Sequence, residues 1–147
     1  MRTRLFDMLG LQEISDRLEI QQLITDYSTA VDTRQFERLL DIFTPDAVID
    51  YSAVGGTVGT PAEVVPWLRE NLAIFSDYFH LVGNHSIVVD GDTATATSIC
   101  VNPMVFADTA PQAMMIVGVW YHDTFVRTPN AWRMTGRVEQ KSFMHSV

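Results

Sequence analysis

Two spacings of hydrophobic residues divide the chain into a helical first half and a strand-rich second half. From Ser15 to Val31 most apolar residues recur at helical spacing, which predicts an amphipathic first helix. A second, short helix is predicted after Asp32, over residues 36–43, and Pro45 should stop it because proline cannot continue a helix. The chain is therefore expected to open with two packed helices.

Cap and turn residues place the next elements. Residues 47–51 are predicted to form a strand, and the glycine-rich residues 55–59 a turn or mobile loop. Thr60-Pro61-Ala62-Glu63 is a capping box with proline at the first helical position, which predicts a third helix through about Phe75. Pro66 lies in its first two turns, so a kink or a later start is expected.

The rest of the chain is rich in Val, Ile, Thr and aromatic residues, which favour strands. Asp90-Gly91-Asp92 is a strong hairpin turn. Four strands are predicted, over residues 79–90, 93–104, 113–126 and 131–141. The fold class is therefore α+β, with three N-terminal helices covering one face of a mainly antiparallel sheet. No repeat or linker interrupts the pattern, so residues 1–147 are expected to be a single domain.

Composition narrows the function classes. The chain has 147 residues, 47% of them hydrophobic, and a net charge of −8 with no Lys/Arg-rich tract, which argues against nucleic-acid binding. Cys100 lies in an apolar alternating run and is expected to be a buried small hydrophobe. Residues 1–8 lack the apolar core of a signal peptide, and no segment reaches the ~18 apolar residues of a membrane span. We therefore expect a cytoplasmic protein with no membrane partner.

Asp32 and His80 are the strongest candidates for chemistry. Both are embedded in apolar sequence, where an unpaired charge is costly, and a carboxylate that orients an imidazole makes a general base. Structural alternatives stay open: Asp32 could cap the second helix, with Gln35 three residues later, and His80 could be a hydrogen-bonded core histidine. Tyr27 continues a helical stripe, so its ring could simply pack in the core. Both Tyr27 and Asp32 would reach one cavity only if the first helix ends near Val31.

A resemblance follows from the order of these motifs. The sequence contains a helix followed by Val31-Asp32, Phe36-x-x-Leu39, Phe43-x-x-Asp46-Ala47, Ile49-Asp50-Tyr51, a capped helix and His80-Leu81-Val82-Gly83. This order resembles the SnoaL-like branch of the nuclear transport factor 2-like superfamily over nearly the whole chain. The resemblance is strongest to scytalone dehydratase, lindane dehydrochlorinase and bile-acid 7α-dehydratase, and it implies a cone-shaped α+β barrel with a curved sheet.

The resemblance implies roles for four residues. Members of this group are lyases with an Asp–His dyad, so His80 would remove a proton and Asp32 would orient it and stabilise the imidazolium. Tyr51 resembles the tyrosine that polarises the substrate through water in scytalone dehydratase. Tyr27 resembles the pocket tyrosine of the bile-acid enzyme, at the same spacing from the aspartate. The implied function is a dehydratase-type elimination on a hydrophobic small molecule. The alternatives are a noncatalytic small-molecule-binding or protein-interaction domain and a ketosteroid-isomerase-like isomerase.

Departures from scytalone dehydratase indicate an apolar substrate. Asn102 stands in the strand where that enzyme has a second histidine, and Met115 and Val117 stand near its polar pocket residues. An apolar polycyclic or alicyclic molecule would suit the methionines and aromatic residues of these strands. The predicted substrate-binding residues are Asn84, Asn102, Met104, Phe106, Met115 and Trp120.

No cofactor or metal is expected. The histidines have no recognisable ligand spacing with Cys, Asp or Glu, and the motif Gly55-Gly56-x-x-Gly59 lacks the spacing of a nucleotide-binding loop. An epoxide hydrolase of this fold would need an Asp-Arg-Asp set, for which Asp50 with Arg137 is a weak candidate. The strands carry more large apolar residues than one pocket needs, which predicts a homodimer or homotrimer. The tail, residues 142–147, is expected to close a pocket or to pack on a neighbour.

Overall fold

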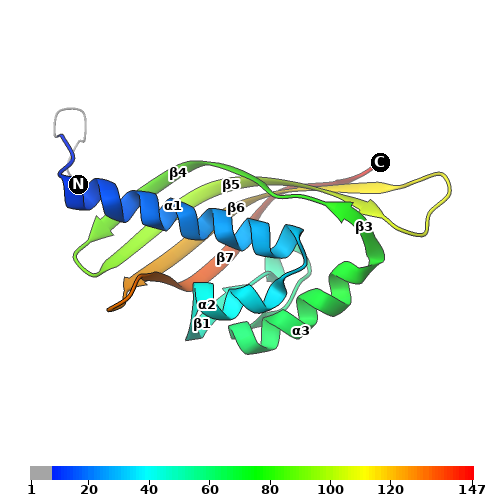
Figure 1. Ribbon diagram of the computed structural model, residues 1–147. Helices are drawn as coiled ribbons and strands as arrows, with labels where there is room; N and C mark the ends of the chain where they lie inside the picture. The colour runs from blue at the N-terminus through cyan, green and yellow to red at the C-terminus, as the bar shows by residue number, and fades with distance from the viewer. Residues whose placement is uncertain (1–7) are drawn as a thin grey trace.

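The structure is a computed structural model that describes residues 8–147, with three α-helices packed against a curled seven-stranded sheet that forms a half-barrel. The helices are α1 (Leu11–Asp32), α2 (Leu39–Ile42) and α3 (Pro61–Asn71). Figure 1 shows all three on the same side of the long strands. The α+β class is confirmed. The signal-peptide prediction falls on residues 1–8, of which residues 1–7 lie outside the described residues.

The sheet is mainly antiparallel, as predicted. Its strands are β1 (Phe43–Asp50), β2 (Val58–Gly59), β3 (Phe75–Tyr78), β4 (Leu81–Asp90), β5 (Thr93–Phe106), β6 (Met114–Arg127) and β7 (Trp132–Ser146). The order is β2-β1-β7-β6-β5-β3, and β4 pairs with β5 as well. Strands β1 and β7 run parallel, so the sheet is mixed at this pair.

The region after α1 differs from the prediction. Asp32 is the last residue of α1, so it does not cap a second helix, and residues 36–38 form only a 3₁₀ turn before the short α2. Strand β1 already begins at Phe43, although Pro45 follows. Residues 44–47 bulge out of the ladder with β7, and a proline is tolerated there because no ladder hydrogen bond needs its missing N–H group.

Helix α3 begins as its capping box predicts. The backbone N–H group of Thr60 donates to Glu63 Oε2 at 2.7 Å, and Pro61 is the first helical residue. The helix ends at Asn71 rather than near Phe75, because residues 72–74 form a 3₁₀ turn and Phe75 opens the short strand β3. Four residues are too few for a periodicity signal, which is why this strand was not predicted.

The core lies between the helices and the sheet, and strand alternation selects its residues. On β5 the even-numbered positions from Ala94 to Met104 are buried, and Cys100 is 1% exposed, which confirms its predicted burial. On β6 the odd-numbered positions from Val117 to Phe125 are buried. Within residues 8–147, no helix is long and apolar enough to cross a membrane. Because these buried strand positions point toward the helices, the inward faces of β5, β6 and β7 are the surfaces that can line a site.

Candidate active site

A cavity of about 250 Å³ lies between the helices and the inward face of the sheet. Its walls are mostly apolar and aromatic, and its polar groups are few, which is typical of a small-molecule site. The apolar lining includes Val31, Trp67, Leu68, Leu72, Phe75, Met104, Met115, Val117, Val119 and Met144. The titratable or polar lining includes Tyr27, Tyr51, Asn71, His80, Asn102, Tyr121 and Glu139.

Asp32 holds His80 at two points. Asp32 Oδ1 lies 2.6 Å from the ring nitrogen Nδ1 of His80, and Asp32 Oδ2 accepts the backbone N–H group of the same residue at 3.0 Å. The His80 side chain is 9% exposed and that of Asp32 is 21% exposed. One carboxylate therefore fixes both the ring and the backbone of the histidine.

The end of α1 explains why these two residues meet. Arg34 has a left-handed φ of 58°, and the N–H groups of Arg34 and Gln35 donate to the carbonyls of Val31 and Ala30. This is a Schellman motif, which terminates the helix just after Asp32. The Arg34 guanidinium then donates to the carbonyls of residues 72 and 75 at 3.1 and 2.7 Å. These contacts tie the helix end to the segment that leads to His80.

A further hydrogen bond joins the end of α1 to the segment that leads to His80. The Tyr78 hydroxyl, two residues before His80, donates to the carbonyl of Val31 at 2.9 Å. Asn102 on β5 donates to the carbonyl of Phe79 at 2.7 Å. The two residues that precede the histidine are therefore both held by hydrogen bonds, one to α1 and one to β5.

This geometry leaves one nitrogen of the His80 ring able to accept a proton. A carboxylate only accepts hydrogen bonds, so in the neutral imidazole Nδ1 carries the hydrogen and Nε2 keeps its lone pair. Because His80 lines the cavity, Nε2 is the ring nitrogen left to take a proton from a bound molecule.

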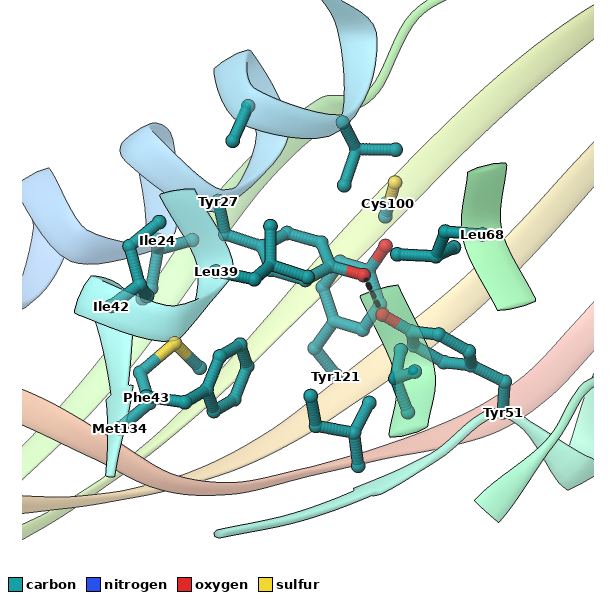
Figure 2. Close-up of a cluster of buried hydrophobic side chains, with 14 of the residues drawn as sticks. Ile24, Tyr27, Leu39, Ile42, Phe43, Tyr51, Leu68, Cys100, Tyr121 and Met134 are labelled. Atoms are coloured by element: carbon teal, nitrogen blue, oxygen red, sulfur yellow. Dashed lines mark hydrogen bonds between the residues drawn. The ribbon is translucent and has the colours of Figure 1, made fainter. Parts of the chain in front are cut away.

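Two tyrosine hydroxyls lie in the same cavity. Tyr27 and Tyr51 are hydrogen-bonded to each other through their hydroxyls, and Figure 2 shows these hydroxyls pointing toward one another. The Tyr27 ring stands edge-on to that of His80, with centroids 6.3 Å apart. Burial raises the pKa of both hydroxyls above the usual value, so both stay protonated. One hydroxyl donates to the other, and the second keeps its hydrogen for a ligand.

A buried ion pair packs against the rings of Tyr27 and Tyr121. Arg137 Nε and Nη2 donate to the two oxygens of Asp123, each at 2.8 Å, and both side chains are fully buried. The Arg137 guanidinium lies 4.0 Å from the ring centre of Tyr27 and 3.8 Å from that of Tyr121. Asp50 is not its partner, because that carboxylate accepts hydrogen bonds from Ser52. The weak Asp50–Arg137 candidate for an epoxide hydrolase is therefore wrong.

Only some of the predicted substrate-binding residues line the cavity. Asn102, Met104 and Met115 line the cavity, whereas the other three lie elsewhere. Trp120 is 39% exposed, because it lies on the outward face of β6. Phe106 packs on the ring of Phe75, with centroids 4.9 Å apart.

Asn84 also lies outside the lining. Its φ of 52° places it at the irregularity in the pairing of β4 with β5, which shifts between Gly83 and Ser86. The neighbouring His85 has its Nδ1 2.8 Å from the Ser98 hydroxyl, and burial lowers its pKa.

Sequence reasoning missed several lining residues. Trp67, Tyr121, Glu139 and Met144 were not predicted to line the cavity, although residues 142–147 were expected to close a pocket and Met144 does line the wall. Glu139 stands two positions after Arg137, the spacing of one strand face, and this was the available signal. Burial raises the pKa of the Glu139 carboxyl to about 7. In the part of the chain that the structure describes, no group of three or more His, Cys, Asp or Glu residues could hold a metal ion.

Comparisons with known proteins agree with this architecture. Rv2910c of Mycobacterium tuberculosis (strain ATCC 25618 / H37Rv) is 54% identical over 136 residues, which cover 92% of each protein. Kfla4162 from Kribbella flavida has the same fold, with 23% identity, a TM-score of 0.82 and coverage of 90% of this chain and 95% of that one.

Two further solved structures share the fold and carry names of lyases. A candidate scytalone dehydratase from Novosphingobium aromaticivorans DSM 12444 is 21% identical, with a TM-score of 0.79, covering 90% of this chain and 88% of that one. Hexachlorocyclohexane dehydrochlorinase LinA-type3 from Novosphingobium barchaimii LL02 is 18% identical, with a TM-score of 0.77, covering 93% of each. The SnoaL-like domain model matches residues 12–138. The chain therefore belongs to the SnoaL-like family, within the nuclear transport factor 2-like superfamily.

Proposed function

We propose that this protein is a cofactor-independent lyase that eliminates a small leaving group from a hydrophobic molecule, with His80 as general base and Asp32 as its orienting partner. The observation that carries the proposal is the 2.6 Å contact between His80 Nδ1 and Asp32 Oδ1 at the cavity wall. A histidine that only packed in the core would need neither a carboxylate partner on Nδ1 nor a position at the wall of a cavity.

The proposed reaction begins with proton transfer to His80. Nε2 takes a proton from a substrate carbon, the C–H electrons form the new double bond, and the leaving group departs from the neighbouring carbon. Asp32 stabilises the imidazolium that forms. A positioned base of this kind contributes roughly 10²–10⁴-fold to a rate. The apolar walls exclude water, and whichever hydroxyl of the Tyr27–Tyr51 pair is not donating to the other donates a hydrogen bond to a polar group of the substrate.

The comparisons support the reaction class rather than the substrate. The named lyases among the structural neighbours have the fold in common with this chain, at low sequence identity. The size of the cavity, about 250 Å³, suits a molecule of one or two rings.

An elimination assay tests the proposal. Purified protein is incubated with alicyclic and aromatic-ring alcohols and with the matching chlorides, and alkene products are measured by gas chromatography and mass spectrometry. We expect turnover by the wild type and loss of turnover in His80→Ala and Asp32→Asn. The matched control is His122→Ala, because His122 bonds to Gln140 on the exposed face of the sheet and does not line the cavity.

A second measurement addresses the dyad directly. Nitrogen-15 NMR of the imidazole reports which ring nitrogen carries the hydrogen, and we expect the Nδ1–H form of His80 in the wild type and a mixture in Asp32→Asn. Tight binding of the ring compounds without any product would overturn the lyase and favour a noncatalytic binding domain.

A further inference from the structure

Glu139 is the polar group of the cavity wall that the dyad and the tyrosines leave unexplained. It lies on β7, lines the cavity, and its Oε2 atom is buried with no hydrogen-bond partner among residues 8–147. Most of the other polar wall groups are paired: His80 with Asp32, Tyr27 with Tyr51, and Asn71 and Asn102 each with a backbone carbonyl. A buried carboxyl without a partner is costly as an anion, and such a group indicates a functional role.

The charged and titratable groups around Glu139 explain its protonation state. Arg137 on the same strand attracts its negative charge, but its Nε and Nη2 atoms are paired with Asp123 and its buried Nη1 atom makes no hydrogen bond to Glu139 or to any other described residue. Asp50 on β1 repels the charge, and the neutral hydroxyls of Tyr27, Tyr51 and Tyr121 supply no counter-charge. Burial is the largest effect and raises the pKa of Glu139 to about 7, so a large share of molecules hold a carboxylic acid at neutral pH.

We propose that Glu139 is the proton donor of the cavity and that the substrate is a hydrophobic alcohol, whose hydroxyl Glu139 protonates as it leaves. This inference rests on the proposed lyase function and assigns its leaving group. Base and acid come from separate segments that border one cavity: His80 from the link before β4, and Glu139 from β7. A substrate in the cavity can therefore contact both.

The step balances without any further reactant. His80 Nε2 takes the proton from carbon, and the C–H electron pair forms the carbon–carbon double bond. The C–O bond breaks with its electron pair going to oxygen, which takes the proton of Glu139 and leaves as water. Afterwards His80 is protonated and Glu139 is ionised, and transfer of one proton from the imidazolium to the carboxylate, through solvent, resets both groups.

The identity of the leaving group determines whether such a donor matters. Hydroxide is a poor leaving group and needs a proton, whereas chloride departs as a stable anion and needs none. A buried carboxylic acid therefore gives an advantage to an alcohol and none to a chloride on the same carbon skeleton.

A pair of matched substrates tests the inference. Glu139→Gln keeps the shape and hydrogen-bonding capacity of the side chain but cannot transfer a proton. We expect elimination from an alicyclic alcohol to fall roughly 10²-fold or more, while elimination from the corresponding chloride changes little. Glu70→Gln is the control, since Glu70 is an exposed residue of α3 outside the cavity lining.

The outcomes separate the two proposals. Equal losses on both substrates in Glu139→Gln would overturn the proton-donor role and leave the lyase standing, as would a wild type that acts on the chloride alone. A wild type that acts on neither substrate would overturn the lyase and the donor role together.

A measurement independent of turnover accompanies the assay. Carbon-13 NMR of carboxyl-labelled glutamate, with Glu139→Gln to assign the signal, should show a carboxylic acid at about pH 6. That signal should shift when cyclohexanol is added. A carboxyl that is already ionised at that pH would overturn the inference.

Discussion

Two carboxyl groups at opposite ends of the chain, Asp16 and Glu139, show how surroundings decide what an acidic side chain does. Asp16 on α1 accepts hydrogen bonds from Arg127 at 2.7 and 2.9 Å, from Trp132 Nε1 at 3.0 Å and from Gln12 at 3.1 Å. Glu139 has an oxygen that, among the described residues, accepts none. The first carboxyl is surrounded by donors, and the second faces a cavity.

The difference appears in the protonation of the two groups. Hydrogen bonds from Arg127 hold the pKa of Asp16 well below its usual range, so it stays charged and fastens α1 to strands β6 and β7. Burial without a donor raises the pKa of Glu139 to about 7. Asp32 combines features of both sites in its contacts, because it is hydrogen-bonded to His80 yet lies at the edge of the cavity. A satisfied carboxylate stabilises the fold, and an unsatisfied one is available for proton transfer.

The largest effect is expected at the dyad. Asp32→Asn should reduce kcat/KM for the elimination roughly 10²–10⁴-fold, because the amide no longer stabilises an imidazolium, although it can still accept the backbone N–H of His80. Thermal unfolding of the same variant should change little. A large fall in Tm with retained activity would reverse the roles assigned to Asp32 and Asp16.

The next largest effect is on stability. Asp16→Asn should lower the free energy of unfolding by about 2–3 kcal/mol, because the Arg127 guanidinium loses its buried charged partner and keeps only the exposed Asp92. Since the pKa of Asp16 is depressed in the folded protein, the stabilisation is present above the unfolded pKa of this carboxyl and is lost as the pH falls below it. Urea unfolding of wild type and variant should therefore converge in acid. The elimination rate per folded molecule should be unchanged.

Glu139 should show the opposite pH dependence. Its folded pKa of about 7 lies above the ordinary value of 4.5, so the folded protein holds this proton more tightly than the unfolded chain does. Its effect on stability is favourable below pH 4.5 and declines as the pH rises to about 7. Between these limits the wild type should lose roughly 2–3 kcal/mol of unfolding free energy relative to Glu139→Gln. Urea unfolding over this pH range measures the difference, and parallel curves would contradict it.

The smallest effect is expected at the tyrosine pair. Tyr51→Phe removes one hydroxyl and leaves that of Tyr27 without this partner, which should cost about 1 kcal/mol of stability. If the hydroxyls contact substrate, KM should change more than Tm does. Tyr121→Phe is a comparison within the same cavity, because Tyr121 is not part of this hydroxyl pair.

The sequence was sufficient for the features that local patterns encode. Helical periodicity, the Thr60 capping box and the Asp90-Gly91-Asp92 turn each predicted an element that the structure contains. Asp32 and His80 were recognisable because they are polar residues in apolar sequence within a familiar order of motifs. Their contact is in the structure, and their catalytic role remains a prediction.

The inward face of each strand was harder to predict. A single irregularity in strand pairing changes which side chains point inward, and the pairing of β7 with β6 contains two. Across one of them Trp132 and Met134 are buried on even positions, whereas Arg137 is buried on an odd one. Glu139 could therefore not be assigned to the cavity, and Trp120 was assigned to the wrong face of β6.

The segments that hold His80 are different from the strands that form the sheet wall of the cavity. His80 is fixed by the end of α1 and by the link between β3 and β4, whereas the sheet wall of the cavity comes from side chains on β5, β6 and β7. Substitutions on those strands can reshape the cavity without moving the histidine. Relatives that keep the helix end and the link can thus diverge in what they accept while sharing one proton-transfer step, and a change of specificity needs only new wall residues.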